Sequence, residues 1–328
     1  MERKKITIMT ACYNEEENVL ELYKAVRRIF EQELPQYDYE HIFIDNCSED
    51  KTVTILKGIA YDDKRVKIIV NARNFGHIRS PFYGLLQGTG DAVISVAADF
   101  QDPPEMIPRF VEKWEEGYKT VVGVKSKSEE NRLMYWVRGR FYKLIKKISE
   151  GEQIENFTGF GLYDRCVVEE LKKMNDPYPY FRGMICEIGF ERAEIEFVQP
   201  VRERGKTKNN IYTLYDMAMT GITANSKVPL RLATMAGFTT AAGSLIIALI
   251  YLIIKLTNWN TFNLGLAPMV IGMFFIGSVL MAFIGIIGEY VGAIYTQVQN
   301  RPLVVVKERI NFDEDAANDN ITNGEDNK

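Results

Sequence analysis

The stretch AVISVAADFQDPPEM, from Ala92 to Met106, ends an apolar, strand-like run with oxygen-bearing side chains. Asp99 and Gln101 are two residues apart on a chain leaving a strand, so both can face one side of a crevice. Oxygen ligands without histidine or cysteine suit Mg²⁺ or Mn²⁺, and Mg²⁺ often combines one or two protein carboxylates with phosphate oxygens. The stretch therefore predicts a metal site, made by Asp99 and Gln101, that can hold a diphosphate.

Polar residues also follow two other strand-like runs. Tyr13, Asn14 and Glu15 come after KITIMTAC, and Asp45 ends HIFID. A single aspartate at a strand end is more often a helix cap or a turn residue. Three such places in one sheet favour a ligand site instead, because ligands of parallel α/β sheets bind beyond the carboxyl ends of the strands. A cation in that site would offset the repulsion between the carboxylates.

The elements that would position these residues alternate between strands and helices. The expected strands cover residues 5–12, 41–45, 66–71, 92–99 and 120–124, and stretches of helical character lie between them. Such alternation is typical of βαβ units, so the sequence predicts an α/β domain with a mostly parallel, Rossmann-like sheet.

Two uncharged, apolar runs lie near the C-terminus, at Ala233–Ile254 and Gly265–Ile287. Each is long enough to cross a bilayer core about 30 Å thick, which needs about 20 helical residues. Two buried core helices are the alternative, and they are less favoured because soluble cores rarely contain two such runs so close together. Bases flank the outer ends, whereas the link carries only Lys255. The positive-inside rule then predicts a transmembrane hairpin with both flanks in the cytoplasm.

Two further segments have membrane-interface character. Residues 132–148 repeat apolar side chains at helical spacing and fill the remaining positions with six bases and no acid. Such a helix is typical of a membrane interface with anionic head groups, although an ordinary surface helix with a core face is the alternative. Residues 209–231 are predicted as a second interfacial helix that leads into the first span.

The net charge of −4 comes from the C-terminal tail at 311–328, which holds six acids and one base. The remainder is nearly neutral, so the charge gives no support for a nucleic-acid partner. The tail is predicted to be a disordered, solvated end. The four isolated cysteines are typical of reduced cytosolic thiols, and the charged N-terminus lacks the features of a secretory signal. The soluble part is therefore expected in the cytoplasm.

Several motifs of this chain resemble those of family 2 glycosyltransferases with a GT-A fold. They are YNEEEN, IFIDNCSEDKT, NARNFG and AADFQDPPEM. Together with YFRG, RERGKTK and the C-terminal hairpin, they are most similar to the polyprenyl-phosphate glycosyltransferases, across about Ile6 to Arg309. The resemblance implies an inverting hexosyltransferase. It would move one sugar from a nucleotide-diphosphate sugar, such as UDP-glucose, to undecaprenyl phosphate for cell-envelope glycan modification.

The resemblance also implies roles for residues. The nucleotide pocket would be lined by Ala11, Tyr13, Asn14, Glu15, Asp45, Ala98 and Asp99. The catalytic groups would be Asp99 and Gln101 on the metal, with Arg202 and Lys208 closing over the phosphates. The acceptor phosphate would meet Lys125, Arg138 and Arg140. Arg182 and Asp102 would support the site.

The chemistry expected of this site needs no strong base. A lipid phosphate is already ionised at neutral pH. The main requirements are therefore the metal as Lewis acid and the positive charges of Arg202 and Lys208. The two histidines, His41 and His77, are expected to be structural. The chain departs from the family in two acidic motifs. Ala97 stands where the DxD motif has its first acid, and Asn46 stands where the second strand has the second of two paired acids. These departures bear on the base and the donor more than on the metal.

The expected organisation has five parts. They are a cytoplasmic GT-A domain at 1–208, an interfacial helix at 209–231, a transmembrane hairpin at 232–290, a cytoplasmic C-terminal segment at 291–310 and the acidic tail at 311–328. The resemblance further implies a bacterial inner-membrane protein and a homo-oligomer, which by resemblance would be a tetramer. Two rival functions are a membrane scaffold with a decayed site, motivated by Ala97 and Ala98, and a processive polysaccharide synthase. The second would need more spans and an acidic base.

Overall fold

The computed structural model describes residues 3–125, 154, 156–200, 228–257 and 266–312. The chain divides into two compact units. The sheet unit holds the N-terminal part and the residues from Asn300 onward, and the helical unit holds the two long C-terminal helices.

Eight strands form one mixed sheet in the order β7-β5-β6-β4-β1-β2-β3-β8. Their bounds are Lys5–Cys12 (β1), Asp38–Asp45 (β2), Val66–Asn71 (β3), Ala92–Ser95 (β4), Thr120–Lys125 (β5), Phe157–Asp164 (β6), Arg192–Phe197 (β7) and Val306–Ile310 (β8). The pairs β1–β2, β1–β4, β2–β3 and β5–β7 are parallel. The predicted α/β class is confirmed, and all five expected strands are present.

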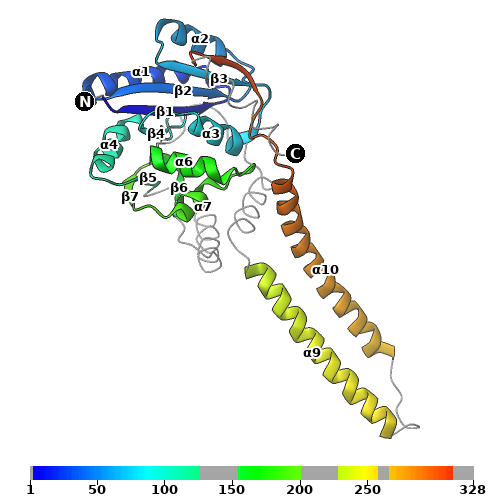
Figure 1. Ribbon diagram of the computed structural model, residues 1–328. Coiled ribbons are helices and arrows are strands. Elements are labelled where there is room, and N and C mark those ends of the chain that lie inside the picture. Colours follow the sequence, from blue (N-terminus) through cyan, green and yellow to red (C-terminus); the bar gives the residue numbers. More distant parts are fainter. Residues whose placement is uncertain (1–2, 126–153, 155, 201–227, 258–265, 313–328) are drawn as a thin grey trace, which may run out of the picture. The chain divides into compact units, whose positions relative to one another are not determined.

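Helices cover both faces of the sheet (Figure 1). Their bounds are Val19–Gln32 (α1), Thr52–Asp62 (α2), Gly76–Leu86 (α3), Pro104–Met106 (η1), Ile107–Glu115 (α4), Arg165–Met174 (α6) and Phe181–Ile188 (α7). The apolar sides of α1, α2 and α4 pack on one face, and those of α3, α6 and α7 pack on the other. The sheet is therefore buried on both sides, as a largely parallel sheet requires.

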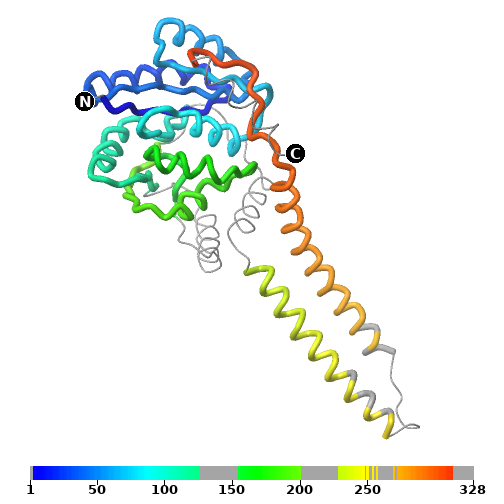
Figure 2. Tube along the Cα trace, viewed as in Figure 1, coloured from blue at the N-terminus to red at the C-terminus, as the bar shows by residue number. Residues whose placement is uncertain are grey.

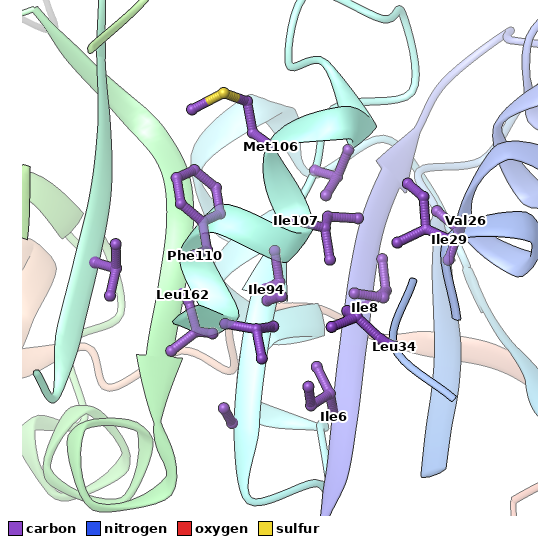
Figure 3. Packing of buried hydrophobic residues seen from close by; sticks show 14 of the residues in the cluster. Ile6, Ile8, Val26, Ile29, Leu34, Ile94, Met106, Ile107, Phe110 and Leu162 are labelled. Carbon is purple, nitrogen blue, oxygen red and sulfur yellow. The ribbon is translucent and has the colours of Figure 1, made fainter. Parts of the chain in front are cut away.

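The core beneath α1 and α4 shows how the sequence pattern builds the fold (Figure 3). Ile6 and Ile8 are two residues apart on β1, so they point to the same face of the sheet. They pack with Ile94 of β4 and Phe110 of α4. Burying one such side chain stabilises the fold by about 1.5–3 kcal/mol, so these layers hold the strand ends in fixed positions.

The C-terminal strand returns to the sheet unit. β8 pairs antiparallel with β3 at the sheet edge (Figure 2), and the Ala72 N–H donates to the Val305 carbonyl at 2.8 Å. Asn311 then donates from Nδ2 to the carbonyls of Ala60, at 2.7 Å, and Val66, at 2.8 Å. The sequence places 291–310 in a separate segment. In the structure, residues 306–310 of that range complete the sheet instead.

The helical unit consists of α9 (Val228–Thr257) and α10 (Leu266–Val298), which contact each other. By length and composition both could cross a membrane, over Val228–Ile247 and Gly272–Val298. The two apolar runs of the sequence are thus confirmed as long helices. Their apolar side chains are largely exposed, including Phe274 and Met281.

Candidate functional site

The carboxyl ends of β1 and β2 meet at one edge of the sheet. The two strands run parallel with Ala11 beside Ile44 and Cys12 beside Asp45. On the other side of β1, the parallel strand β4 carries the chain toward Asp99. The register thus brings the three predicted strand ends to the same edge, which is where ligands of such sheets bind.

The loop after β1 is fastened to the loop after β2. Asn14 has a positive φ of 57°, a left-handed conformation that asparagine tolerates better than most residues. Its N–H donates to Ser48 Oγ at 2.9 Å, and its Oδ1 accepts from the Glu49 N–H at 2.8 Å. Glu15 continues the link, because its N–H donates to Thr52 Oγ1 at 2.9 Å. Tyr13, between β1 and these contacts, is partly buried.

Asp45 is fully buried at the end of β2. Its carboxylate accepts hydrogen bonds from the N–H and the hydroxyl of Ser48. Burial raises the pKa of Asp45, while the hydrogen bonds from Ser48 act in the opposite direction. The side chain therefore holds the turn that follows β2, and its contact with a nucleotide base stays a prediction.

Asn46 joins three loops of the site. Its N–H donates to the Cys12 carbonyl at 2.9 Å, which ties it to the end of β1. Its Oδ1 accepts from the Phe75 N–H at 2.9 Å, and its Nδ2 donates to Asn74 Oδ1 at 2.9 Å. The sequence flags this position only as a departure from paired acids. The structure explains it, since a carboxylate has no hydrogen to donate.

A turn after β4 displays Asp99 and Gln101. Phe100 between them has a positive φ of 57°, and the Gln101 N–H donates to Asp99 Oδ1 at 3.2 Å. Asp102 is turned inward and accepts from the Ala97 N–H at 3.1 Å. Asp99 and Gln101 are partly exposed, whereas Asp102 is buried. The turn therefore closes through Asp102 and leaves the two predicted metal ligands accessible.

The charges of Asp99, Asp102 and Lys125 influence one another. Burial raises the pKa of Asp102 to about 7; the hydrogen bond from Ala97 and the charge of Lys125 lower it, and the charge of Asp99 raises it. Lys125 is the last residue of β5 and is partly buried. The structure thus brings together a predicted metal ligand, a supporting carboxyl group and one base of the predicted acceptor site.

The donor set fits a hard divalent cation. Asp99 and Gln101 offer only oxygen, and a cation beside them would relieve the repulsion between the carboxyl groups of Asp99 and Asp102. Among the described residues, no group of three or more His, Cys, Asp or Glu side chains could hold a metal ion. A cation held by Asp99 and Gln101 would need further oxygen ligands, such as those of a diphosphate.

Some of the remaining predicted site residues lie outside the described part of the chain, and two lie within it. Arg138, Arg140, Arg202 and Lys208 lie outside the described residues, as do residues 132–148. Arg182 lies in the first turn of α7 and is partly buried. Ala98, before Asp99, is buried against the apolar cluster of α2 and β3, so its side chain packs in the core.

Comparison with known proteins adds a family and near full-length relatives. The family model described as Glycosyl transferase family 2 matches residues 7–172. The SfII prophage-derived bactoprenol glucosyl transferase of Shigella flexneri is 36% identical over 92% of this chain and 97% of its own. The prophage bactoprenol glucosyl transferase homolog of Escherichia coli K12 is 35% identical over 92% of this chain and 98% of its own. An uncharacterized glycosyltransferase of Bacillus subtilis, YkcC, is 34% identical over 92% of this chain and 93% of its own.

Proposed function

Since this chain belongs to glycosyl transferase family 2, we propose that it moves one sugar from a nucleotide-diphosphate sugar to a polyprenyl phosphate. It is a glycosyltransferase, and its sheet with helices on both faces is the GT-A architecture expected from its motifs. The finer parts of the proposal are the donor, the lipid acceptor, the metal and the membrane anchor.

The acceptor follows from one observation, which carries the proposal. Relatives named bactoprenol glucosyl transferases match 92% of this chain, so the match extends beyond the sheet unit into the long apolar helices. A chain with a hairpin of two such helices can keep its active site beside a lipid-borne substrate. We therefore propose undecaprenyl phosphate as the acceptor and a glucosyl group, carried by UDP, as the donor.

The strand-end turn supplies the donor side of the mechanism. Asp99 and Gln101 would hold Mg²⁺ or Mn²⁺, and the cation would stabilise the negative charge on a departing diphosphate. Asp102 keeps the turn closed through the Ala97 N–H, so both ligands stay at the edge where the loops after β1 and β2 meet. Arg202 and Lys208 are proposed to add fixed positive charge to the same phosphates.

The acceptor side needs positioning more than proton transfer. A phosphate monoester is already ionised at neutral pH, so its oxygen can attack the anomeric carbon without a base. His41 cannot serve as that base, because it is fully buried with Nε2 3.0 Å from Thr10 Oγ1. Burial lowers the pKa of His41 to about 3, so the ring is neutral. Lys125, with Arg138 and Arg140, is proposed to hold the lipid phosphate.

A donor panel tests this proposal. Purified full-length protein is incubated with undecaprenyl phosphate, Mg²⁺ or Mn²⁺, and UDP-, GDP- or dTDP-sugars. We expect nucleotide release and one lipid-linked sugar with one donor class, and no product with undecaprenol, which lacks the phosphate. A polymeric product would support a processive synthase. Absence of both turnover and metal-dependent nucleotide binding would support a scaffold, and either result would contradict the proposal.

A further inference from the structure

Three arginines that the proposed mechanism does not use gather on the sheet unit. Arg73 lies in the loop after β3, Arg79 lies on α3, and Arg301 comes just before β8. The guanidinium carbons of Arg73 and Arg79 lie 4.1 Å and 5.5 Å from the ring centroid of Phe75. Arg301 is close enough for its charge to act on Arg79. These three residues are called the arginine cluster below.

Among the described residues, the arginine cluster has no acidic partner. Some other arginines of this part of the chain are paired with carboxylates, such as Arg65 with Asp63 at 2.8 Å. No member of the cluster forms such an ion pair within those residues. Like charges gathered without a counter-charge destabilise one another, so the cluster would be stabilised by an anion.

Arg79 has a buried hydrogen-bond donor without an acceptor. One terminal nitrogen donates to the Pro302 carbonyl, but its Nε is buried and has no acceptor. Burial lowers the pKa of Arg79, and the charges of Arg73 and Arg301 lower it as well. Tyr178 acts in the opposite direction. The guanidinium remains charged at neutral pH, so a buried donor of a charged group is left without an acceptor.

Arg301 closely follows the second long apolar helix in the sequence. Arg301 is three residues after Val298, the last residue of α10, so their Cα atoms are at most about 11 Å apart along the chain. Arginine clusters that directly follow a membrane helix on its cytoplasmic side are typical of contacts with anionic lipid head groups. The planar guanidinium also matches the oxygens of a phosphate, with two parallel hydrogen bonds.

We propose that Arg73, Arg79 and Arg301 bind the phosphate of an anionic membrane lipid and so fix the sheet unit against the bilayer. The inference rests on the proposed membrane anchor, but it is separate from the acceptor site. It names a lipid of the surrounding membrane as the ligand. A free phosphate or nucleotide has the same chemistry, and the test distinguishes these sources.

Lipid selectivity of the reconstituted protein tests the proposal. Full-length protein in phosphatidylcholine vesicles receives trace spin-labelled phosphatidic acid or spin-labelled phosphatidylcholine, and the fraction of motionally restricted label gives the relative affinity. The double variant Arg73→Gln/Arg301→Gln should lose preference for phosphatidic acid by about fivefold per arginine. Arg79 is kept because it also holds Pro302. Arg28→Gln, at an exposed position on α1, is the matched control and should keep the wild-type preference.

Three outcomes would overturn the inference. The first is an equal preference in the wild-type protein and the double variant, with unchanged melting temperatures. The second is displacement of the labelled lipid by millimolar inorganic phosphate or UDP, which would identify a soluble ligand. The third is a loss of preference in Arg28→Gln as large as in the double variant, which would show that surface charge in general sets the preference. Failure of the anchor itself would look different, because neither labelled lipid would then show a restricted fraction.

Discussion

At the end of β2, the Asn46 side chain donates and accepts hydrogen bonds at the same time. Its Nδ2 donates to Asn74 Oδ1 at 2.9 Å and to the Gly76 carbonyl at 3.1 Å, and its Oδ1 accepts from Phe75 and Asn71. An amide can make both kinds of bond, whereas an ionised carboxylate only accepts. The loop after β3 therefore depends on the residue that departs from the paired acids of the family.

Asn46→Asp should destabilise the protein, because it removes two donors and sets a carboxylate against two oxygen acceptors. We expect a loss of about 2 kcal/mol, seen as a lower melting temperature of the full-length protein in detergent. Asn74→Asp is the matched control. It keeps the Oδ1 that accepts from Asn46 and Gly76, so it should melt close to the wild type. Equal melting of all three proteins would contradict this account of Asn46.

Glu40 is a buried carboxylate on β2 that is stabilised by cations. It lies 3.0 Å from Lys5 Nζ and 2.8 Å from Lys67 Nζ, and it accepts from the Thr7 hydroxyl at 2.6 Å. Burial would raise its pKa, but the bonds from Lys67, Thr7 and Thr89 lower it to about 2. A lowered pKa means that this stabilisation is present above the unfolded value near 4 and is lost as the pH falls toward 2.

Glu40→Gln should therefore lower stability at pH 7 by about 2 kcal/mol, since two cations lose their partner. Between pH 5 and pH 3 its melting temperature should fall less than that of the wild type. Thermal melts at several pH values measure both effects. Glu31→Gln, at an exposed carboxylate on α1, should match the wild type within about 0.5 kcal/mol. A parallel pH dependence of Glu40→Gln and the wild type would contradict the assignment.

At the scale of elements, local patterns predict β1 to β5 and miss three strands, which are the interior strand β6 and the edge strands β7 and β8. The runs around Ile8, Ile44 and Ile69 are apolar enough to identify buried strands, because both faces of a parallel sheet are covered. In contrast, β7 reads RAEIEF and β8 reads VKERI. Their charged edge positions carry little strand signal, and the partner of β8 is more than 230 residues away in the sequence. Only the folded chain shows that the segment after the second apolar run joins the sheet.

The candidate site is likewise only partly predictable from the sequence. The positions of Asp99, Asn14 and Asp45 at strand ends follow from the sequence, since parallel strands bring their carboxyl ends to one edge. The inward turn of Asp102 does not, because it depends on how the turn after β4 closes on the Ala97 N–H. The three-loop contacts of Asn46 do not either, because they depend on a loop 28 residues away in the sequence.

Strand β8 should be needed for stability of the sheet unit. A chain ending after Gln299 would lose β8 and the two hydrogen bonds from Asn311, and it would expose the edge of β3 to aggregation. We expect a lower yield of monodisperse protein and a lower melting temperature. A chain ending after Phe312 keeps these contacts and is the control, with a melting temperature close to the full-length protein. Similar behaviour of the two truncations would contradict a structural role for β8.

At the scale of the whole molecule, the proposed membrane anchor, formed by α9 and α10, would determine where the reaction takes place. Both are long and apolar enough to cross a bilayer, and the bases at their outer ends predict cytoplasmic flanks. The sheet unit and the proposed nucleotide-sugar site would then share the cytoplasm, where nucleotide sugars are made. The link at residues 258–265 would lie outside the membrane.

Cysteine labelling tests this topology. In intact bacterial cells, a membrane-impermeant maleimide should react with Asn263→Cys in the link and spare the four native cysteines. The partly exposed Cys47 in the sheet unit should react only after the membrane is permeabilised, so it serves as an internal control. Labelling of Cys47 in intact cells, or protection of Asn263→Cys, would reverse or remove the proposed hairpin.

The most direct test of the central claim is the initial rate of sugar transfer to undecaprenyl phosphate by the full-length wild type and Asp99→Ala, with Mg²⁺ and with excess chelator. Asp62→Ala, at an exposed position at the end of α2, serves as the control. We predict metal-dependent transfer by the wild type and Asp62→Ala, and a rate at least about 100-fold lower for Asp99→Ala, as expected when a group that stabilises the transition state is removed. Undiminished transfer by Asp99→Ala, or by the wild type in chelator, would contradict the claim.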